Sequence, residues 1–139
     1  MTAVPLSMRP DHLTWKDQTA LPHGARIAVL IGDPSEPGRY VIRLRVPAGH
    51  RVMPHTHPDE RVYTVLSGTF YLGFGEYFLD RRLEEWPKGS VILVPAGLAH
   101  FQSADLTEYE VQIDGDGPTA ADYVHSGDDP RGPRPLSRA

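Results

Sequence analysis

Short runs of β-branched and aromatic residues, separated by turn-forming residues, recur along the chain. Two of these runs are residues 25–32 (ARIAVLIG) and 40–46 (YVIRLRV), and the segment between them contains two prolines and a glycine. In the second run, Arg43 and Arg45 alternate with apolar residues, which is the period-two pattern of a half-buried strand. The pattern predicts short strands joined by turns rather than long helices.

Further apolar runs extend the same rhythm, and they predict strands within residues 61–68, 69–75, 90–97, 99–104 and 108–115. The first two of these are expected to form a hairpin that turns at Ser67 and Gly68. A helical pattern is seen in residues 76–86 (EYFLDRRLEEW), where we expect one or two turns of helix in a loop. Many short strands with turn signals are typical of an all-β fold, an antiparallel sandwich or barrel.

The length of 139 residues indicates a single domain. Residues 1–24 contain three prolines and are expected to form an irregular N-terminal arm, and residues 25–125 contain all of the strand-like runs described above. Residues 126–139 offer few groups to bury and are expected to be a flexible tail. The 13 glycines and 14 prolines suit a fold with many turns.

Charge and composition narrow the function classes. The net charge is −4 and Lys and Arg form no stripe, which argues against a nucleic-acid partner. The first residues lack the basic and apolar regions of a signal peptide, and no apolar run is long enough to span a bilayer. We therefore expect a cytoplasmic protein without a membrane partner. The absence of cysteine excludes disulfides, thiolate nucleophiles and cysteine-bound metals.

Two histidines, His55 and His57, are two residues apart between Pro54 and Pro58. Residues i and i+2 of a strand project to the same face, so both imidazoles can reach one ion. Taken alone, however, this spacing is more often found in solvent-facing histidines. A second stretch of the chain is needed to decide between the two interpretations.

The tetrapeptide VPAG occurs twice, at residues 46–49 and 94–97. In each copy we expect a type I turn with proline at its second position and glycine at its fourth. The first copy leads into the pair of histidines described above, and the second leads into His100. Each half of the chain thus contains a strand, a turn and an imidazole expected to point inward, which favours a metal site.

The spacing of these residues resembles the two sequence motifs of the cupin superfamily. The matching positions are Gly49, His55, His57 and Gly68 in the first motif, and Gly89, Pro95, Gly97 and His100 in the second, where Ala104 replaces the family's asparagine. The resemblance extends over residues 25–117. It implies an antiparallel jelly-roll β-barrel, a homodimer, and one divalent metal ion per chain held by His55, His57 and His100.

The glutamate of the first cupin motif is displaced in this chain. The resemblance places it at position 61, which is Arg61, whereas Glu60 lies one residue earlier. In a regular strand this shift turns the Glu60 carboxylate outward and Arg61 inward. A β-bulge between Glu60 and Gly68 would restore Glu60 as a fourth ligand. Without it, the centre has three histidines, and Glu60 and Arg61 can also form a solvated pair at the rim.

Two further side chains are candidates for a role in catalysis. Arg61 is one, because it is expected to point inward beside the imidazoles. Gln102 is the other, since it lies two residues beyond His100 on the same face of a strand. Its amide would bond a ligand or a metal-bound water, although a purely structural glutamine fits the pattern equally well.

A three-histidine cupin centre implies a small metal-dependent enzyme. The favoured hypothesis is an Fe(II) dioxygenase-type oxidoreductase acting on a small organic molecule, because cupins with three-histidine iron centres include thiol and diketone dioxygenases. Imidazole also binds Zn, Ni and Cu, and Mn is a further alternative, so the ligands do not select the metal. The alternatives are a non-catalytic cupin that binds or senses a small molecule or metal, and a metal-assisted isomerase, lyase or hydrolase.

Overall fold

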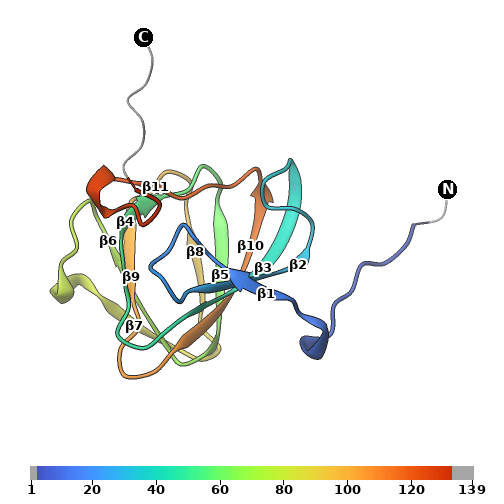
Figure 1. Cartoon of the computed structure of the whole chain (residues 1–139), viewed down its shortest axis with the longest axis horizontal. Helices are drawn as coiled ribbons and strands as arrows, with labels where there is room; N and C mark the ends of the chain where they lie inside the picture. Colours follow the sequence, from blue (N-terminus) through green and yellow to red (C-terminus); the bar gives the residue numbers. More distant parts are fainter. Residues whose placement is uncertain (1–2, 133–139) are drawn as a thin grey trace, which may run out of the picture.

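Two antiparallel β-sheets face each other in the computed structural model, which describes residues 3–132 (Figure 1). The six-stranded sheet has the order β1 (Trp15–Asp17), β2 (Arg26–Ile31), β3 (Gly38–Val46), β10 (Tyr109–Gly117), β5 (Arg61–Ser67) and β8 (Val91–Val94). The five-stranded sheet has the order β11 (Asp122–Tyr123), β4 (Arg51–Thr56), β9 (His100–Ser103), β6 (Thr69–Phe74) and β7 (Glu84–Pro87). The strands of one sheet do not pair with the strands of the other within residues 3–132. The expected antiparallel jelly-roll is therefore confirmed, with two separate sheets in place of a closed barrel.

The core lies between the sheets and follows the alternation of the strands. On β3 the residues Ile42, Leu44 and Val46 are buried, whereas Arg43 and Arg45 lie on the outer face. There the Nε atoms of the two arginines donate to Gln112 and Glu110 of β10, at 3.0 and 2.7 Å. These cross-strand pairs tie β3 to β10 and leave the inner face apolar.

The hairpin expected at Ser67 and Gly68 does not form, and this prediction was wrong. The chain does turn at Gly68, where φ is +70°, but β5 lies in the six-stranded sheet and β6 in the other. A side chain at Gly68 would collide with the carbonyl oxygen of Glu108. Val65 and Ser67 also pair with the consecutive residues Val111 and Glu110, which leaves one extra residue in β5. This bulge and the close contact bend the chain from one sheet to the other.

The helix expected in residues 76–86 is reduced to one 3₁₀ turn, Asp80–Arg82. The following residues form β7, which pairs with β6 so that Trp86 lies opposite Phe70. Trp86 packs against the core, and this burial together with the strand hydrogen bonds outweighs the local helical pattern. Two other 3₁₀ turns, Pro10–His12 and Ser126–Asp128, are found among the described residues.

The two ends of the chain differ. Residues 3–14 extend away from the sheets, and the arm then joins the six-stranded sheet through β1 (Figure 1). Of the expected tail, residues 126–132 are placed and include a buried Asp129 bonded to Arg131, while residues 133–139 lie outside the described part.

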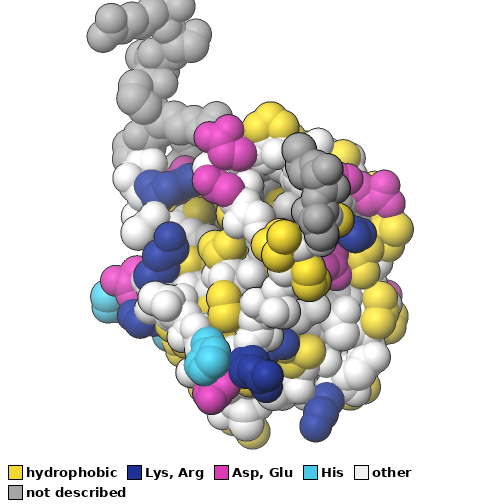
Figure 2. Space-filling view, turned by 90° about the vertical axis from the view of Figure 1, so that its right-hand side faces the viewer, with side chains coloured by type: hydrophobic (Ala, Val, Ile, Leu, Met, Phe, Trp, Pro, Cys, Tyr) yellow, Lys and Arg dark blue, Asp and Glu magenta, His cyan; other side chains and the backbone are white. Residues whose placement is uncertain are grey.

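No helix within residues 3–132 is long and apolar enough to cross a membrane. On the face shown in Figure 2, acidic and basic side chains are interspersed among neutral ones.

Candidate metal centre

Three buried histidines meet between the sheets. His55 on β4 is paired directly with His100 on β9, and His57 follows the end of β4. The ring centroids of His55 and His100 are 4.3 Å apart, and those of His57 lie 5.0 and 5.1 Å from the other two. One nitrogen from each ring lies within 4.8 Å of the other two. The three imidazoles therefore lie close enough together to hold a metal ion.

A β-bulge in β4 directs His55 into the interior. Val52 pairs with Gln102 and His55 with His100, so β4 has one more residue than β9 over this interval. Pro54 lies in the bulge, where its lack of an N–H costs no ladder hydrogen bond. Val52 and His55 are therefore both buried although they are three residues apart.

The two VPAG turns support the cluster, but they are not the expected type I turns. The N–H groups of His50 and Leu98 donate to the carbonyls of Pro47 and Pro95, so proline is the first residue of each turn and glycine the third. Both glycines have φ of +75°, which is the conformation that position three of a type II turn requires. The N–H of Gly97 also donates to the His57 carbonyl at 2.9 Å, which fixes the segment after β4.

Each imidazole is oriented by a main-chain carbonyl. The Nδ1 atoms of His55, His57 and His100 lie 2.7, 2.8 and 3.0 Å from the carbonyl oxygens of residues 53, 120 and 98. A carbonyl only accepts, so each Nδ1 carries the hydrogen and each Nε2 carries the lone pair. This is the usual arrangement of histidines that bind metals. The Nε2 of His100 is buried with no hydrogen-bond partner in the described residues, so the donor set fits a metal ion.

The surroundings keep the three imidazoles neutral. Burial, together with the positive charge of Arg61, lowers the pKa of His100 to about 4, although the hydrogen bond to the Leu98 carbonyl opposes this shift. The pKa of His55 is held well below its usual range by burial, by His100 and by Arg61, and that of His57 is lowered by burial and by Arg61. Neutral imidazole is the form that binds metal, so protons do not compete at neutral pH.

The same lowered pKa values predict that the metal-free protein loses stability in acid. Between its ordinary pKa of 6.5 and about 4, His100 takes up a proton only when the chain unfolds, so the free energy of unfolding falls as the pH falls through this range. His100 alone contributes a decrease of about 3 kcal/mol, and His55 and His57 act in the same direction. Urea denaturation at a series of pH values measures this decrease.

The matched variants for this test are His100→Gln and His125→Gln. His100→Gln should lose much of the decrease, whereas His125→Gln, at an exposed position, should keep it. An equal pH dependence in the wild type and His100→Gln would contradict the assignment of the effect to the cluster.

Arg61 points inward from β5, as the strand alternation predicts, and only 6% of its surface is exposed. Its Nη1 atom lies 2.6 Å from Nε2 and 2.7 Å from Nδ1 of His57. Since Nδ1 carries the hydrogen that is donated to Ala120, only Nε2 accepts from Arg61. The guanidinium thus occupies the lone pair that a metal ion would need.

Glu60 is not brought to the cluster, and the expectation of a fourth ligand is corrected. Its side chain is exposed in a separate groove that Arg39 and Asp114 also line. A bulge does occur in β5, but it lies at Leu66, and the alternation of the strand up to Val65 is regular. Arg61 therefore faces inward and Glu60 outward.

Gln102 lies on β9 close to the histidines and is buried. Its Nε2 donates to the hydroxyl of Tyr109 at 2.7 Å, whereas its Oε1 has no partner among the described residues. The side chain lines a cavity of about 340 Å³ together with His55, His57 and Arg61. Sequence reasoning identified this glutamine from its spacing, but it could not identify its partner.

The main-chain groups that orient the imidazoles were missed. The carbonyls of Met53 and Leu98 each come two residues before their histidine, but every histidine has a carbonyl at this spacing, so the sequence gives no signal for them. The carbonyl of Ala120 is 63 residues from His57 and comes from the segment after β10, so no local pattern indicates it.

Comparisons with known proteins agree with this structure. Residues 4–113 match the family described as the ChrR cupin-like domain. Germin-like protein 8-2 of Oryza sativa subsp. japonica is 48% identical over 52 residues, which cover 35% of this chain and 24% of the rice protein. A germin-like protein of Mesembryanthemum crystallinum is 43% identical over 58 residues, with coverage of 35% and 24%. These matches span about a quarter of the length of each relative.

Solved structures with the same fold extend over most of the chain. The polyketide cyclase RemF from Streptomyces resistomycificus has a TM-score of 0.71 and 19% identity, with 94% of this chain and 90% of that chain covered. KdgF from Halomonas sp. has a TM-score of 0.62 and 15% identity, with 81% and 94% covered. At these identities the likeness concerns the fold. The family match, the two sheets and the histidine cluster lead to one conclusion: the chain belongs to the ChrR cupin-like domain family of the cupin superfamily.

Proposed function

We propose that the protein is a metal-dependent oxidoreductase of the dioxygenase type, in which His55, His57 and His100 hold one Fe(II) ion beside a small organic substrate. The observation that carries the proposal is the set of three buried imidazoles, each with Nδ1 bonded to a carbonyl and with Nε2 as the atom that can bind a metal, although Nε2 of His57 also accepts a hydrogen bond from Arg61. No carboxylate of the described residues belongs to this cluster.

The donor set bears on the chemistry. Three imidazoles suit iron, zinc, copper and nickel, and they leave part of the coordination sphere open for other groups. Fe(II) bound there would supply one-electron chemistry with O₂. Because imidazole is neutral, the side chains of the cluster cancel none of the charge of a divalent ion, which favours a substrate with a negative donor group.

The chain's own residues bind and orient the substrate. The cavity of about 340 Å³ adjoins the cluster, and its size suits a small molecule. The Oε1 of Gln102 is available as an acceptor, and the Nε of Arg61 is available as a donor. Apolar side chains such as Ile42 and Leu44 line a further part of the wall.

The experiment that tests this function compares two metals. The metal-free protein is loaded anaerobically with Fe(II) or Zn(II), and oxygen uptake and substrate loss are measured with diketones, thiols, catechols and carboxylic acids. We expect oxygen uptake in step with substrate loss for the iron form and none for the zinc form. Turnover by both forms without oxygen uptake would overturn the dioxygenase proposal.

Turnover without oxygen uptake would favour metal-assisted isomerase, lyase or hydrolase chemistry. The solved neighbours include a polyketide cyclase and a DMSP lyase, so such reactions are the first alternative to examine. Saturable binding without turnover of any compound would instead support a non-catalytic cupin that binds or senses a small molecule or metal.

We also propose that the protein is a homodimer. Strand β8 lies at the edge of its sheet, and Val91 and Leu93 on it are 63% and 53% exposed. Exposed apolar edge strands favour pairing with another chain. Sedimentation velocity at micromolar concentration should therefore give twice the chain mass of 15.4 kDa, and a monomer would contradict the proposal.

The cytoplasmic location expected from the sequence stays a prediction.

A further inference from the structure

Arg61 is a buried cation without an ion-pair partner in the part of the chain that the structure describes. Its side chain is only 6% exposed, and residues 3–132 contain no carboxylate in an ion pair with it. Its Nε atom is buried without a hydrogen-bond partner in the same residues. A buried charge is costly unless it is paired, so such a group calls for an anion from outside the chain.

The charged side chains of Arg131 and Asp59 already have partners within the protein. Arg131 lines the cavity, but its Nε and Nη2 donate to the two carboxylate oxygens of Asp129, at 2.9 and 3.1 Å. Asp59 does not line the cavity, and its carboxylate accepts hydrogen bonds from the hydroxyl groups of Tyr40 and Thr119, at 2.6 and 2.5 Å. Arg61 is therefore the cavity's available cation.

Metal binding would free more of the guanidinium. The Nη1 of Arg61 donates to Nε2 of His57, which is the atom that a metal ion would take. Within the described residues, the Arg61 side chain donates a hydrogen bond to His57. A metal ion at the cluster would release this bond and leave Arg61 and the ion side by side, with positive charge on both. One anion placed between them would be attracted by both charges.

The rest of the cavity wall indicates what the anion is attached to. Apolar side chains from the six-stranded sheet, Ile27, Ile42 and Leu44, line the cavity that contains Arg61. The Oε1 of Gln102, a residue only 2% exposed, lies in the same wall and accepts no hydrogen bond from residues 3–132. A ligand that satisfies the guanidinium and the apolar wall has one anionic group and an apolar body, and a water molecule or a ligand N–H or O–H can donate to Gln102.

We propose that the cavity binds a small organic carboxylate, with its carboxylate on the Arg61 guanidinium and its apolar body against Ile27, Ile42 and Leu44. The planar fork of arginine matches a carboxylate. A single available guanidinium, with Asp59 in a neighbouring hydrogen-bond network, favours one negative charge over a phosphate dianion. The proposal deepens the proposed function and names its substrate class. Contact between the carboxylate and the metal rests on the proposed function, whereas binding of the carboxylate to Arg61 does not.

The test uses the metal-free protein, so that it does not depend on the proposed reaction. Benzoate and benzamide have nearly the same shape and differ in charge, and inorganic phosphate serves as a third probe. We expect isothermal titration calorimetry to show benzoate binding at least about tenfold more tightly than benzamide or phosphate. Arg61→Met keeps an apolar stem and should reduce benzoate binding at least about tenfold while leaving benzamide binding unchanged.

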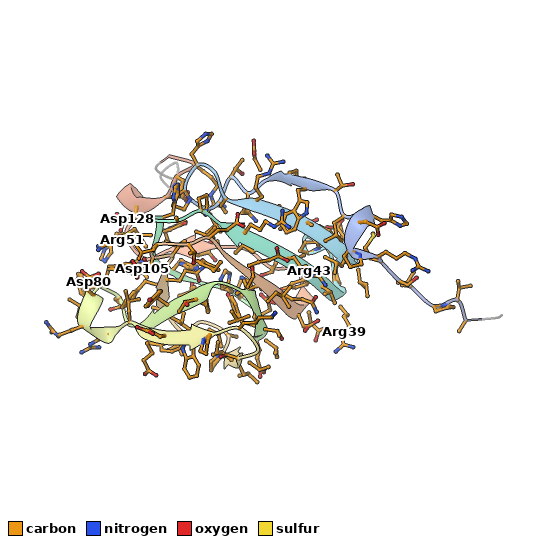
Figure 3. All side chains as sticks on the ribbon, turned by 90° about the horizontal axis from the view of Figure 1, so that it is seen from below. Arg39, Arg43, Arg51, Asp80, Asp105 and Asp128 are labelled. Carbon is orange, nitrogen blue, oxygen red and sulfur yellow. The ribbon has the colours of Figure 1, made fainter. Side chains whose placement is uncertain are left out.

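Arg39→Met is the matched control. Arg39 is exposed on β3 and points outward at the edge of the molecule (Figure 3), so its loss should change no affinity. Equal affinities for benzoate and benzamide, including no binding of either, would overturn the proposal, as would a preference for phosphate. A benzoate preference that survives in Arg61→Met would also overturn it. Any of these results can occur while metal-dependent oxygen uptake is intact, so the two proposals fail separately.

Discussion

Replacing His100 by alanine is expected to remove nearly all bound metal and all metal-dependent activity. His100 is fully buried, and its Nε2 faces the cluster without a partner in the described residues. Its loss leaves two imidazoles, which give neither the affinity nor the geometry of three. Loss of a group that only supports a ligand typically costs 10- to 100-fold in affinity, so loss of a ligand should cost at least about 100-fold. Competition with a chromophoric chelator measures the affinity.

Two controls separate this effect from a loss of folding. His125→Ala removes an exposed imidazole outside the cluster and should leave the metal affinity unchanged. His100→Gln fills more of the buried space than alanine does, so it should fold well and still lose the metal. Full metal occupancy in a folded His100→Gln variant would show that His100 does not bind the ion.

The second large effect is expected at Arg61, where glutamate should strengthen metal binding. Arg61→Glu removes a buried positive charge beside His57 and introduces a carboxylate at the position where the cupin motif has one. Opposite charges attract strongly in a buried site, so the affinity for a divalent ion should rise at least about tenfold. The metal-free variant should be less stable than the wild type, because its carboxylate is buried without a metal. Chelator competition and urea denaturation measure the two effects.

Glu60→Gln is the matched control at the neighbouring position. Glu60 is exposed and lies in a different groove, so this variant should bind metal as the wild type does. Loss of metal in Glu60→Gln, or no change in Arg61→Glu, would mean that β5 presents the opposite face to the cluster.

The inward direction of Arg61 could be predicted because it depends on local geometry: Arg61 and Glu60 are consecutive residues, so only one of them can face the cavity. The two-residue spacing of His55 and His57 correctly brought them together, although a bulge in β4 directs His55 inward and His57 follows the end of that strand. The turn before His100 was located correctly because proline and glycine define it, although its type was not. The positive φ angle of Gly97 shows that this turn is of type II.

The remaining features depend on contacts between distant parts of the chain. The passage of β5 and β6 into different sheets depends on the bulge at Leu66 and on the contact of Gly68 with Glu108. Strand β7 forms where a helix was expected because β6 is available to pair with it. The carbonyl that orients His57 comes from Ala120, beyond the last long strand. No periodicity within a short window contains this information.

The central claim is that His55, His57 and His100 together hold one divalent ion. X-ray absorption spectroscopy of the protein loaded with one equivalent of Zn(II) tests it most directly, because imidazole ligands give a recognisable scattering pattern. We expect three imidazole nitrogens at about 2.0–2.1 Å, with oxygen completing the shell, and a loss of imidazole scattering in the His100→Gln variant. A spectrum with fewer than three imidazoles, or one that is identical in the wild type and His100→Gln, would contradict it.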